Sequence, residues 1–454
     1  MTDGTTRASS PATVPLNAIV SRAEARRLIA STSFGNFMEY VDFATYGFLA
    51  SLIGAAFFPA ASPTAQLLSS LAAFGVSFLF RPLGGALFGY FGDRFGRKAS
   101  LVSSIIVMSV STTLIGCLPT EARIGIFAPA LLVFLRIIQG ISVGGEFSVA
   151  STFIVEHAPH KRRAFYASYI LVTSGIGTVA GNLLVLLLTV SLPSHAMAEW
   201  GWRVPFWIAL PLGAIGLYLR TRVEESPVFE RMVDADGTPN NPYKQFKRSD
   251  IGMLALVAAF CGANGLTFFY YATYFNNYLT QTRGFSRTDS LVLSVISLTI
   301  YSALCPLAGM LSDRLGRKRI FVIAFFVEGI IAIPVFMLLG TNFWGALVGM
   351  ILFGLPLAIT NTIVSVLIVE LFGKRMRTTA GAIGHEVGVG FLSGTGPFVA
   401  SALVAATSNA LVPAYYLGAI LVAAGILLVF LLPESGKRSL IIDGGTVADE
   451  QLPA

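Results

Sequence analysis

Several ionisable side chains stand inside long apolar stretches of the sequence, among them Glu39, Asp42, Arg136 and Glu146. A charged side chain in the middle of a bilayer costs roughly a few kcal/mol unless it is paired or hydrated. Glu39 and Asp42 are three residues apart, so they share one face of a helix. Burial favours the neutral form of a carboxyl group and a nearby cation favours its charged form, so such a group can exchange a proton. Arginine stays charged, and its planar fork can bind a carboxylate through two hydrogen bonds. These residue types predict proton exchange beside a carboxylate-binding cation; the alternative is a buried ion network that only holds helices together.

The apolar stretches recur along the whole chain. The 454 residues are 54% hydrophobic and 12% charged, with a mean hydropathy of +0.73, whereas soluble domains carry about 25% charged residues. Roughly 20 apolar residues are enough for a helix to cross a bilayer. The sequence therefore predicts an all-α membrane protein with twelve transmembrane helices, at 28–57, 66–91, 99–118, 126–156, 164–191, 203–220, 251–279, 288–311, 319–340, 343–372, 379–406 and 411–432.

The net charge of +7 reflects membrane topology. Most of the 31 lysines and arginines lie on alternate segments between the predicted helices, as expected for cytoplasmic loops. This pattern predicts cytoplasmic termini and argues against a nucleic-acid partner. The first residues lack the apolar core of a secretory signal. The three cysteines, Cys117, Cys261 and Cys305, have neither the spacing of a metal site nor that of a disulfide framework.

The chain divides into two related halves. The long hydrophilic segment 221–250 separates a first half, 28–220, from a second, 251–432, with tails at 1–27 and 433–454. GYFGDRFGRK begins at Gly89 and GMLSDRLGRK at Gly309. Glu156 precedes Arg163 by seven residues, and Glu370 precedes Arg377 by the same interval. Two six-helix halves predict a binding site at their interface near mid-membrane, with access alternating between the two sides.

The repeated loop resembles the signature of the major facilitator superfamily. Four segments are similar to its metabolite:proton symporter branch, which includes bacterial symporters of proline and glycine betaine, shikimate, citrate and 2-oxoglutarate. They are GNFMEYVDFATYGFLA, FLFRPLGGALFGYFGDRFGRK, RIIQGISVGGEFSVASTFIVEHAP and GWRVPFWIALPLGAIGLYLR. The resemblance implies two pseudo-symmetric six-helix halves, with the first and fourth helices lining a central cavity. The acids and the arginine would then be within reach of one another.

This resemblance allows roles to be assigned to individual residues. The expected proton-coupling residues are Asp42, Glu39, Arg136 and Glu146. The expected substrate-binding residues are Arg136, Asp42, Tyr46, Gln139, Asn264, Tyr270, Tyr274, Asn361, His385 and Glu386. A tyrosine cage would suit a quaternary ammonium, although aromatic side chains at helical spacing more often pack, and His385 could relay protons, bind substrate or pack.

A third group of residues is expected to gate the cavity. These residues are Arg81, Gly89, Asp93, Arg94, Gly96, Arg97, Glu156, Arg163, Gly309, Asp313, Arg314, Gly316, Arg317, Glu370 and Arg377. An aspartate of the repeated loop can cap a neighbouring helix and pair with a cation across the interface in one conformation only, which would bias alternating access. A plain tight turn with positive charges that anchor the loop is the alternative.

The sequence favours proton-coupled uptake of a small metabolite that carries a carboxylate, either a zwitterion such as proline or betaine or an organic acid. No phosphate-binding loop motif is present, so we expect no cofactor and a proton gradient as the energy source. The alternatives are a uniporter or exchanger, and more remotely a sensor with a carrier fold. We find no nucleophile–base or metal constellation that would indicate an enzyme. The expected setting is a monomer in the bacterial inner membrane, with the solute, protons and lipid as its partners.

Overall fold

A computed structural model describes residues 22–59, 62–95, 97–221, 250–372 and 377–436, although the side chains of some helical residues in these ranges lie outside the description. Within this part of the chain, twelve helical segments are long and apolar enough to cross a membrane. The predicted twelve-helix membrane fold is confirmed. Most of the predicted tails and inter-half segment lies outside the described residues, so the domain boundaries stay predictions.

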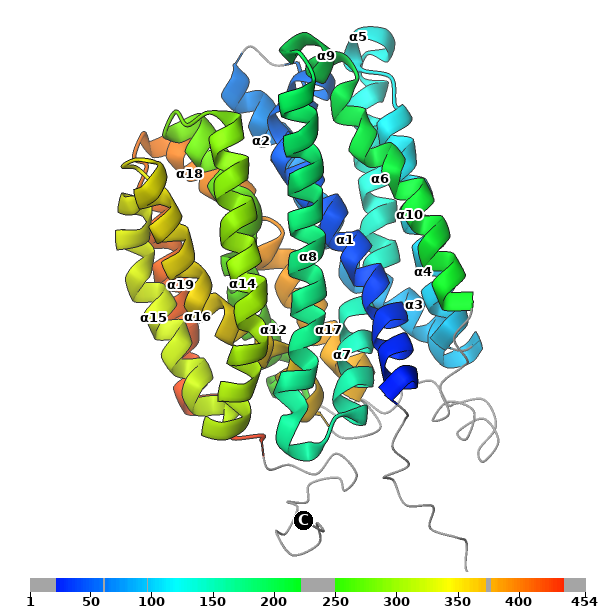
Figure 1. The fold of residues 1–454 in the computed structure, drawn as a ribbon, viewed down its shortest axis with the longest axis vertical. Helices are drawn as coiled ribbons and strands as arrows, with labels where there is room; N and C mark the ends of the chain where they lie inside the picture. The colour runs from blue at the N-terminus through cyan, green and yellow to red at the C-terminus, as the bar shows by residue number, and fades with distance from the viewer. Residues whose placement is uncertain (1–21, 60–61, 96, 222–249, 373–376, 437–454) are drawn as a thin grey trace, which may run out of the picture.

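The first group of helices begins at α1 and ends at α10 (Figure 1). Its elements are α1 (Arg22–Phe57), α2 (Pro63–Leu79), α3 (Arg81–Phe95), α4 (Arg97–Cys117), α5 (Glu121–Ile124), α6 (Phe127–Val143), α7 (Glu146–His157), α8 (Arg163–Ser191), α9 (Ser194–Glu199) and α10 (Val204–Thr221). α2 with α3, and α6 with α7, each form one span that is interrupted near its middle.

The second group follows the segment that lies outside the description. Its elements are α12 (Asp250–Phe269), α13 (Phe275–Asn277), α14 (Arg287–Leu315), α15 (Arg317–Leu338), α16 (Phe343–Glu370), α17 (Arg377–Gly388), α18 (Gly396–Thr407) and α19 (Val412–Leu431). Wider π-helical turns at Tyr270–Tyr274, Tyr278–Thr282 and Val389–Ser393 extend α12 and α17 without ending their spans.

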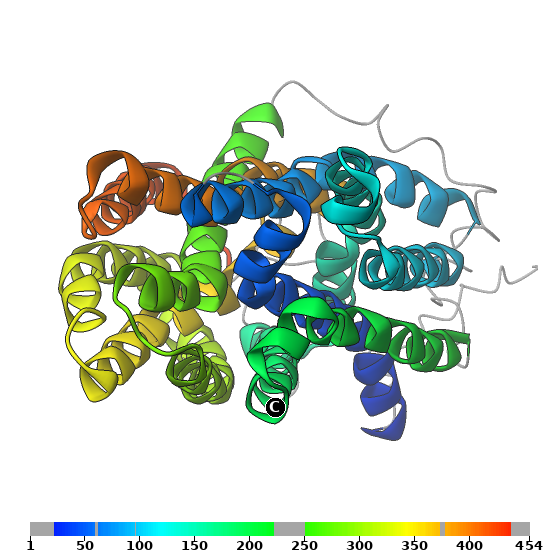
Figure 2. The same cartoon turned by 90° about the horizontal axis from the view of Figure 1, so that it is seen from above.

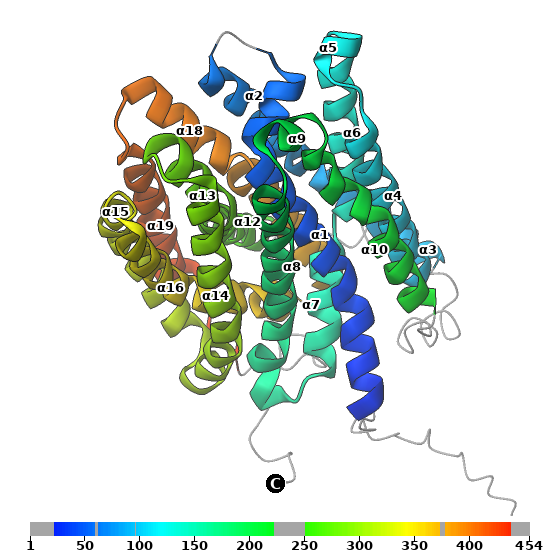
Figure 3. The ribbon, with the colours of Figure 1, turned by 45° about the horizontal axis from the view of Figure 1, so that its top comes forward.

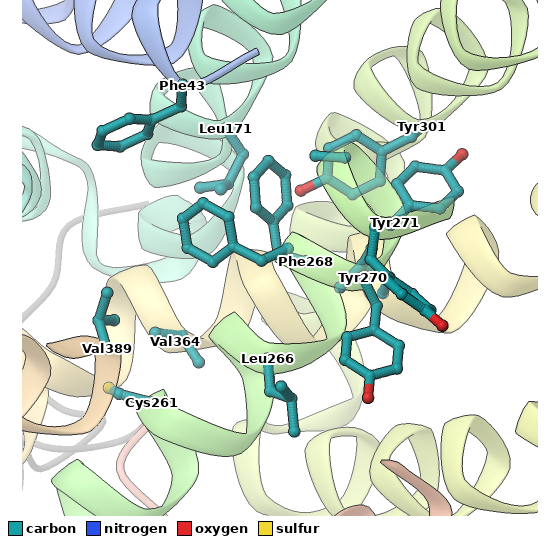
Figure 4. Close-up of a cluster of buried hydrophobic side chains, with 14 of the residues drawn as sticks. Phe43, Leu171, Cys261, Leu266, Phe268, Tyr270, Tyr271, Tyr301, Val364 and Val389 are labelled. Carbon is teal, nitrogen blue, oxygen red and sulfur yellow. The ribbon is translucent and has the colours of Figure 1, made fainter. Parts of the chain in front are cut away.

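The two groups lie side by side when the molecule is seen from above (Figure 2). α8 and α14 run next to each other along the interface, while α2 contacts α18 and α3 contacts α17. α3 and α7 lie toward one end of the molecule, and α5 and α9 lie at the opposite end (Figure 3). The hydrophobic core is continuous across the interface, because Phe43 and Leu171 belong to the same cluster as Phe268 and Tyr301 (Figure 4).

The break between α6 and α7 brings α3 into close contact with both helices. Gly145 has a φ of +95°, a conformation that glycine adopts without steric cost. A Cβ on Gly144 would lie 2.3 Å from the carbonyl oxygen of Arg81, so only glycine permits this approach. The break therefore helps to position Arg81, whose side chain belongs to one of the buried charged clusters.

Candidate functional site

An ion pair between α1 and α6 lies at the centre of the first group. Nη1 of Arg136 donates to Oδ2 of Asp42 at 2.9 Å and to Oε1 of Gln139 at 2.9 Å. Gln139 in turn donates to Thr112 of α4. Arg136 is fully buried and Asp42 is 6% exposed. The structure thus brings together the acid and the arginine that the sequence placed inside apolar spans.

Arg136 has binding capacity that this pair does not use. Its guanidinium carbon lies 3.5 Å from the centroid of the Tyr46 ring, a cation–π contact that holds the group in place. Among the described residues, Nε and Nη2 of Arg136 have no hydrogen-bond partner. Two small cavities border Asp42, each with room for about one water molecule, and Arg136 lines one of them. An anion beside Arg136 would satisfy the unused donors.

A second charged cluster joins the two groups of helices. Arg81 of α3 forms an ion pair with Glu39 of α1 at 2.7 Å and another with Glu386 of α17 at 2.8 Å. Nδ1 of His385 lies 3.1 Å from Oε1 of Glu386. The His385 ring stacks on Phe147 of α7, with centroids 4.7 Å apart. Glu39 therefore pairs with Arg81 and not with Arg136, and Arg81 contacts the other half directly.

Glu146 belongs to a third cluster. Arg220, in the last turn of α10, donates to Glu146 and to the carbonyl oxygen of Leu101. The structure therefore does not bring Glu146 to Arg136. Sequence reasoning missed this partner, because a basic residue near the end of a span, such as Arg220, first indicates topology. Its place in the last turn of an apolar span was the available signal.

The expected substrate residues of the second half are dispersed. Asn264 donates to Thr360 at 2.9 Å, and Asn361 donates to the hydroxyl of Tyr301 at 2.7 Å. The rings of Tyr270 and Tyr274 lie 4.9 Å apart and pack around Phe336 inside the second group. These two tyrosines have the surroundings of packing residues and form no cage with Tyr46.

Glu328 of α15 is a buried acid whose role the sequence leaves open. It is fully buried and accepts a hydrogen bond from Thr360 at 2.8 Å and a longer one from Thr267 at 3.5 Å. It has no cationic partner in the described part of the chain. Glu328 therefore joins α15 to α12 and α16 through hydroxyl groups.

The expected gating residues of the second half connect α14 and α16 to α8. Asp313 accepts hydrogen bonds from the backbone N–H groups of Ala164 at 3.1 Å and Phe165 at 2.9 Å, at the start of α8. It also pairs with Arg317 at 2.8 Å. Glu370 lies 3.5 Å from Arg163, again across the interface. Asp313 thus caps a helix of the other half, as suggested for this loop, but its cationic partner Arg317 belongs to its own half and not to the other side of the interface. The gating role of Asp313 stays a prediction.

The remaining gating candidates are placed only in part. A Cβ on Gly309 would lie 2.7 Å from the carbonyl oxygen of Ala164, so the close approach of α14 to α8 requires glycine there. Gly316 has a φ of +93°, and Arg314 is exposed. Gly96 lies outside the described residues. For the other candidates the description covers the backbone but not the side chain or its surroundings; these are Gly89, Asp93, Arg94, Arg97, Glu156 and Arg377.

The two groups also touch at the end that carries α5 and α9. Asn277 of α13 donates to the carbonyl oxygen of Gly47 at 3.1 Å, and Arg287 of α14 donates to Ser51 at 3.0 Å. Asp42 and Arg136 therefore lie between two layers of contacts, one toward each end of the molecule. Such contacts must break alternately for a solute to reach the pair from either side.

Twelve spanning helices in two groups, with a charged pair buried between two contact layers, are the architecture of a membrane transporter. The family model of the Major Facilitator Superfamily matches residues 32–385 and 278–446. The chain belongs to this superfamily, whose members move solutes and are not enzymes.

Two curated relatives cover nearly the whole chain. A proline/betaine transporter of Salmonella typhimurium is 36% identical over 437 residues, which cover 93% of this chain and 86% of the relative. The glycine betaine/proline/ectoine/pipecolic acid transporter OusA of Dickeya dadantii is 36% identical over 448 residues, which cover 96% and 88%. These relatives support a secondary transporter.

The solved structures show the same fold. The partially occluded inward open conformation of the xylose transporter XylE from E. coli has a TM-score of 0.75 at 18% identity and covers 91% of this chain and 99% of that chain. The crystal structure of a D-xylose-proton symporter has a TM-score of 0.72 at 21% identity, with 91% and 100% covered. At this identity the likeness concerns the fold alone.

Proposed function

We propose that this protein is a proton-coupled symporter that takes up a small solute bearing a carboxylate. The observation that carries the proposal is the Asp42–Arg136 pair, in which a buried guanidinium keeps two nitrogens without a partner among the described residues. A carboxylate matches the fork of Arg136 in both charge and geometry. The solutes named for the relatives, such as proline and betaine, are zwitterions of this kind.

The proposed cycle exchanges one partner of Arg136 for another. While Asp42 is ionised, it holds Arg136 through Nη1 and competes with an incoming anion. A proton on Asp42 removes this competition, so Arg136 can bind the solute carboxylate. Loss of the proton on the other side restores the ion pair and displaces the solute. Proton and solute are thereby coupled, because each arrangement leaves the buried guanidinium with one anionic partner.

The setting of this cycle is part of the proposal. We place the chain in a bacterial inner membrane as a monomer with both termini in the cytoplasm, since the basic loops alternate along the sequence. The end that carries α3 and α7 then faces the cytoplasm, and the end that carries α5 and α9 faces outward. The proton gradient supplies the energy, and no cofactor takes part.

Purified protein in liposomes that enclose a pH-sensitive dye tests the proposal. Pools of betaine-like zwitterions, dicarboxylates and aromatic acids are added outside, with xylose as a solute that has no carboxylate. We expect one carboxylate pool to acidify the interior and xylose to have no effect. Acidification by xylose would contradict the carboxylate anchor. Radiolabel counterflow without acidification from any pool would instead indicate a uniporter or exchanger.

A further inference from the structure

The cluster of Glu39, Arg81, Glu386 and His385 is split between the two halves. Glu39 and Arg81 come from α1 and α3, whereas His385 and Glu386 are consecutive residues of α17. Arg81 joins the two pairs through its contacts at 2.7 Å and 2.8 Å. Separation of α3 from α17 must therefore pull Glu386 and His385 away from Arg81 and Glu39. Arg81 lines one small cavity together with Asp42 and Arg136, but the ion pairs of the cluster join the two halves, whereas the Asp42–Arg136 pair lies within the first half.

The charges in this cluster do not balance without an additional proton. Two carboxylates face one guanidinium, which leaves a net charge of −1 if His385 is neutral. Glu39, Arg81 and Glu386 are 2%, 4% and 0% exposed, so water does little to stabilise the excess charge. His385, at 9%, is the most exposed member and therefore the one most open to proton exchange.

The neighbouring described groups do not supply the missing charge. Tyr40 of α1 and Cys261 of α12 face the cluster and are uncharged at neutral pH. Glu146 of α7 is near Glu39 but is paired with Arg220. On α16, Glu370 is paired with Arg163 across the interface. A single proton within the cluster therefore makes it neutral.

The position of this proton determines the cost of separating the halves. With the proton on His385 or on Glu386, the first half keeps the neutral pair Glu39–Arg81 and the second half, with Glu386 and His385, has no net charge. With the proton on Glu39, separation leaves a lone cation on one side and a lone anion on the other. With no proton, Glu386 is left as an unpaired anion. An unpaired charge in a buried site is strongly unfavourable.

We propose that this cluster is a second proton-binding site, in which a proton on His385 permits α3 and α17 to separate and the cytoplasmic end to open. The proposal relies on the alternating access of the fold and on the orientation given under the proposed function. It depends neither on the identity of the solute nor on proton exchange at Asp42.

A distance between spin labels on the two halves tests the proposal directly. Lys161 and Arg319 are exposed residues at the end that carries the Asp313 contacts, one in each half. Both are replaced by cysteine in a Cys117→Ser background, because Cys261 and Cys305 are buried. As the pH falls from about 8 to about 5, the range over which histidines gain a proton, we expect a population with a longer distance to grow.

Isosteric variants separate the proposal from other causes of a pH response. We expect His385→Gln to remove the pH response and to lower the open fraction at acid pH about tenfold or more. Glu386→Gln leaves each half neutral without a proton, so its open population should already be large at pH 8. In combination with His385→Gln, which removes the remaining titratable group of the second half, the open population should be independent of pH. Glu39→Gln makes the same chemical change but strands Arg81 upon separation, so it should suppress opening. Asp289→Asn, an exposed change in the first turn of α14, should keep the pH response.

Two results would overturn the proposal. One is a His385→Gln protein with a wild-type pH response, and the other is equal behaviour of Glu386→Gln and Glu39→Gln. If His385→Gln does not fold, the comparison of the two glutamate variants decides alone. A failure of the proposed symport would leave these distances unchanged, because no solute is present in the experiment.

Discussion

Arg136 and Asp42 form the residue-scale centre of the proposed mechanism. The pair is buried, and Tyr46 and Gln139 fix the arginine on two sides. Nη1 is the atom shared with Asp42 and Gln139, while Nε and Nη2 have no partner among the described residues. A buried donor without a partner costs about 1–3 kcal/mol. A bound carboxylate would remove this cost, which supports Arg136 as the anchor of the solute.

Arg136→Lys tests this anchor. Lysine keeps the charge but loses the planar fork and the cation–π surface, so we expect the Kd of the solute to rise about tenfold or more. Equilibrium binding of the solute that the liposome pools identify measures the change. Arg123→Lys, at an exposed position on α5 at one end of the molecule (Figure 3), is the matched control and should bind as the wild type does. Equal affinity of Arg136→Lys and the control would contradict the anchor.

The sequence indicated which charged residues are functional candidates better than it indicated which residues they pair with. Asp42, Arg136 and Gln139 could be proposed together, because an ionisable group in an apolar span needs a partner and the resemblance placed the two helices at one cavity. The pairing of Arg81 with Glu39 and Glu386 was not predictable in this way. It depends on the approach of α3 to α17, two helices that are distant in sequence, and no local pattern encodes that distance.

At the scale of elements, the site depends on close contact between α2 and α6, which both belong to interrupted spans. Arg136, Gln139 and Gly140 lie on α6, and a Cβ on Gly140 would lie 1.8 Å from the carbonyl oxygen of Ser77 on α2. The twelve spans could be read from hydropathy. The breaks at Phe80 and at Gly144 and Gly145 could not, since a continuous apolar run does not reveal where two backbones meet.

Gly140→Ala tests the need for this approach. The added methyl group must push α2 from α6, and such overpacking costs about 1–3 kcal/mol. We therefore expect a lower Tm in detergent and weaker solute binding, because Arg136 and Gln139 move with α6. In Gly252→Ala, on α12, the added Cβ meets nothing within 4 Å, so this variant should keep the wild-type Tm. Equal melting of both variants would show that α2 and α6 tolerate separation.

At the scale of the whole molecule, the two halves are held together by contacts at both ends. Asp313 caps α8 toward the end that we assign to the cytoplasm. Asn277 and Arg287 reach α1 toward the other end. The repeated loop motif suggested the cap of Asp313 on a neighbouring helix, whereas no motif indicated the second contact layer. Alternating access requires that the two layers break at different times.

Asp313→Asn tests the first layer. The amide keeps one accepting oxygen in place of two and loses the negative charge at the N-terminus of α8, which together contribute about 1–3 kcal/mol. With spin labels at residues 161 and 319, we expect the population of molecules with the longer distance between the labels to grow about tenfold relative to the wild type. Asp289→Asn, an exposed change in the first turn of α14, the helix that also carries Asp313, should leave the distances between the labels unchanged. A variant with unchanged distances would remove Asp313 from the gate.

The most direct test of the account is Asp42→Asn in the liposome assay, with exchange and accumulation measured on the same preparation. The amide cannot take up or release the proton, but it leaves Arg136 free to bind the solute. We expect radiolabel counterflow to continue while solute-driven acidification of the interior disappears, and Asp289→Asn to behave as the wild type in both measurements. Acidification at the wild-type rate by Asp42→Asn would contradict the central claim, because proton coupling would then not pass through Asp42.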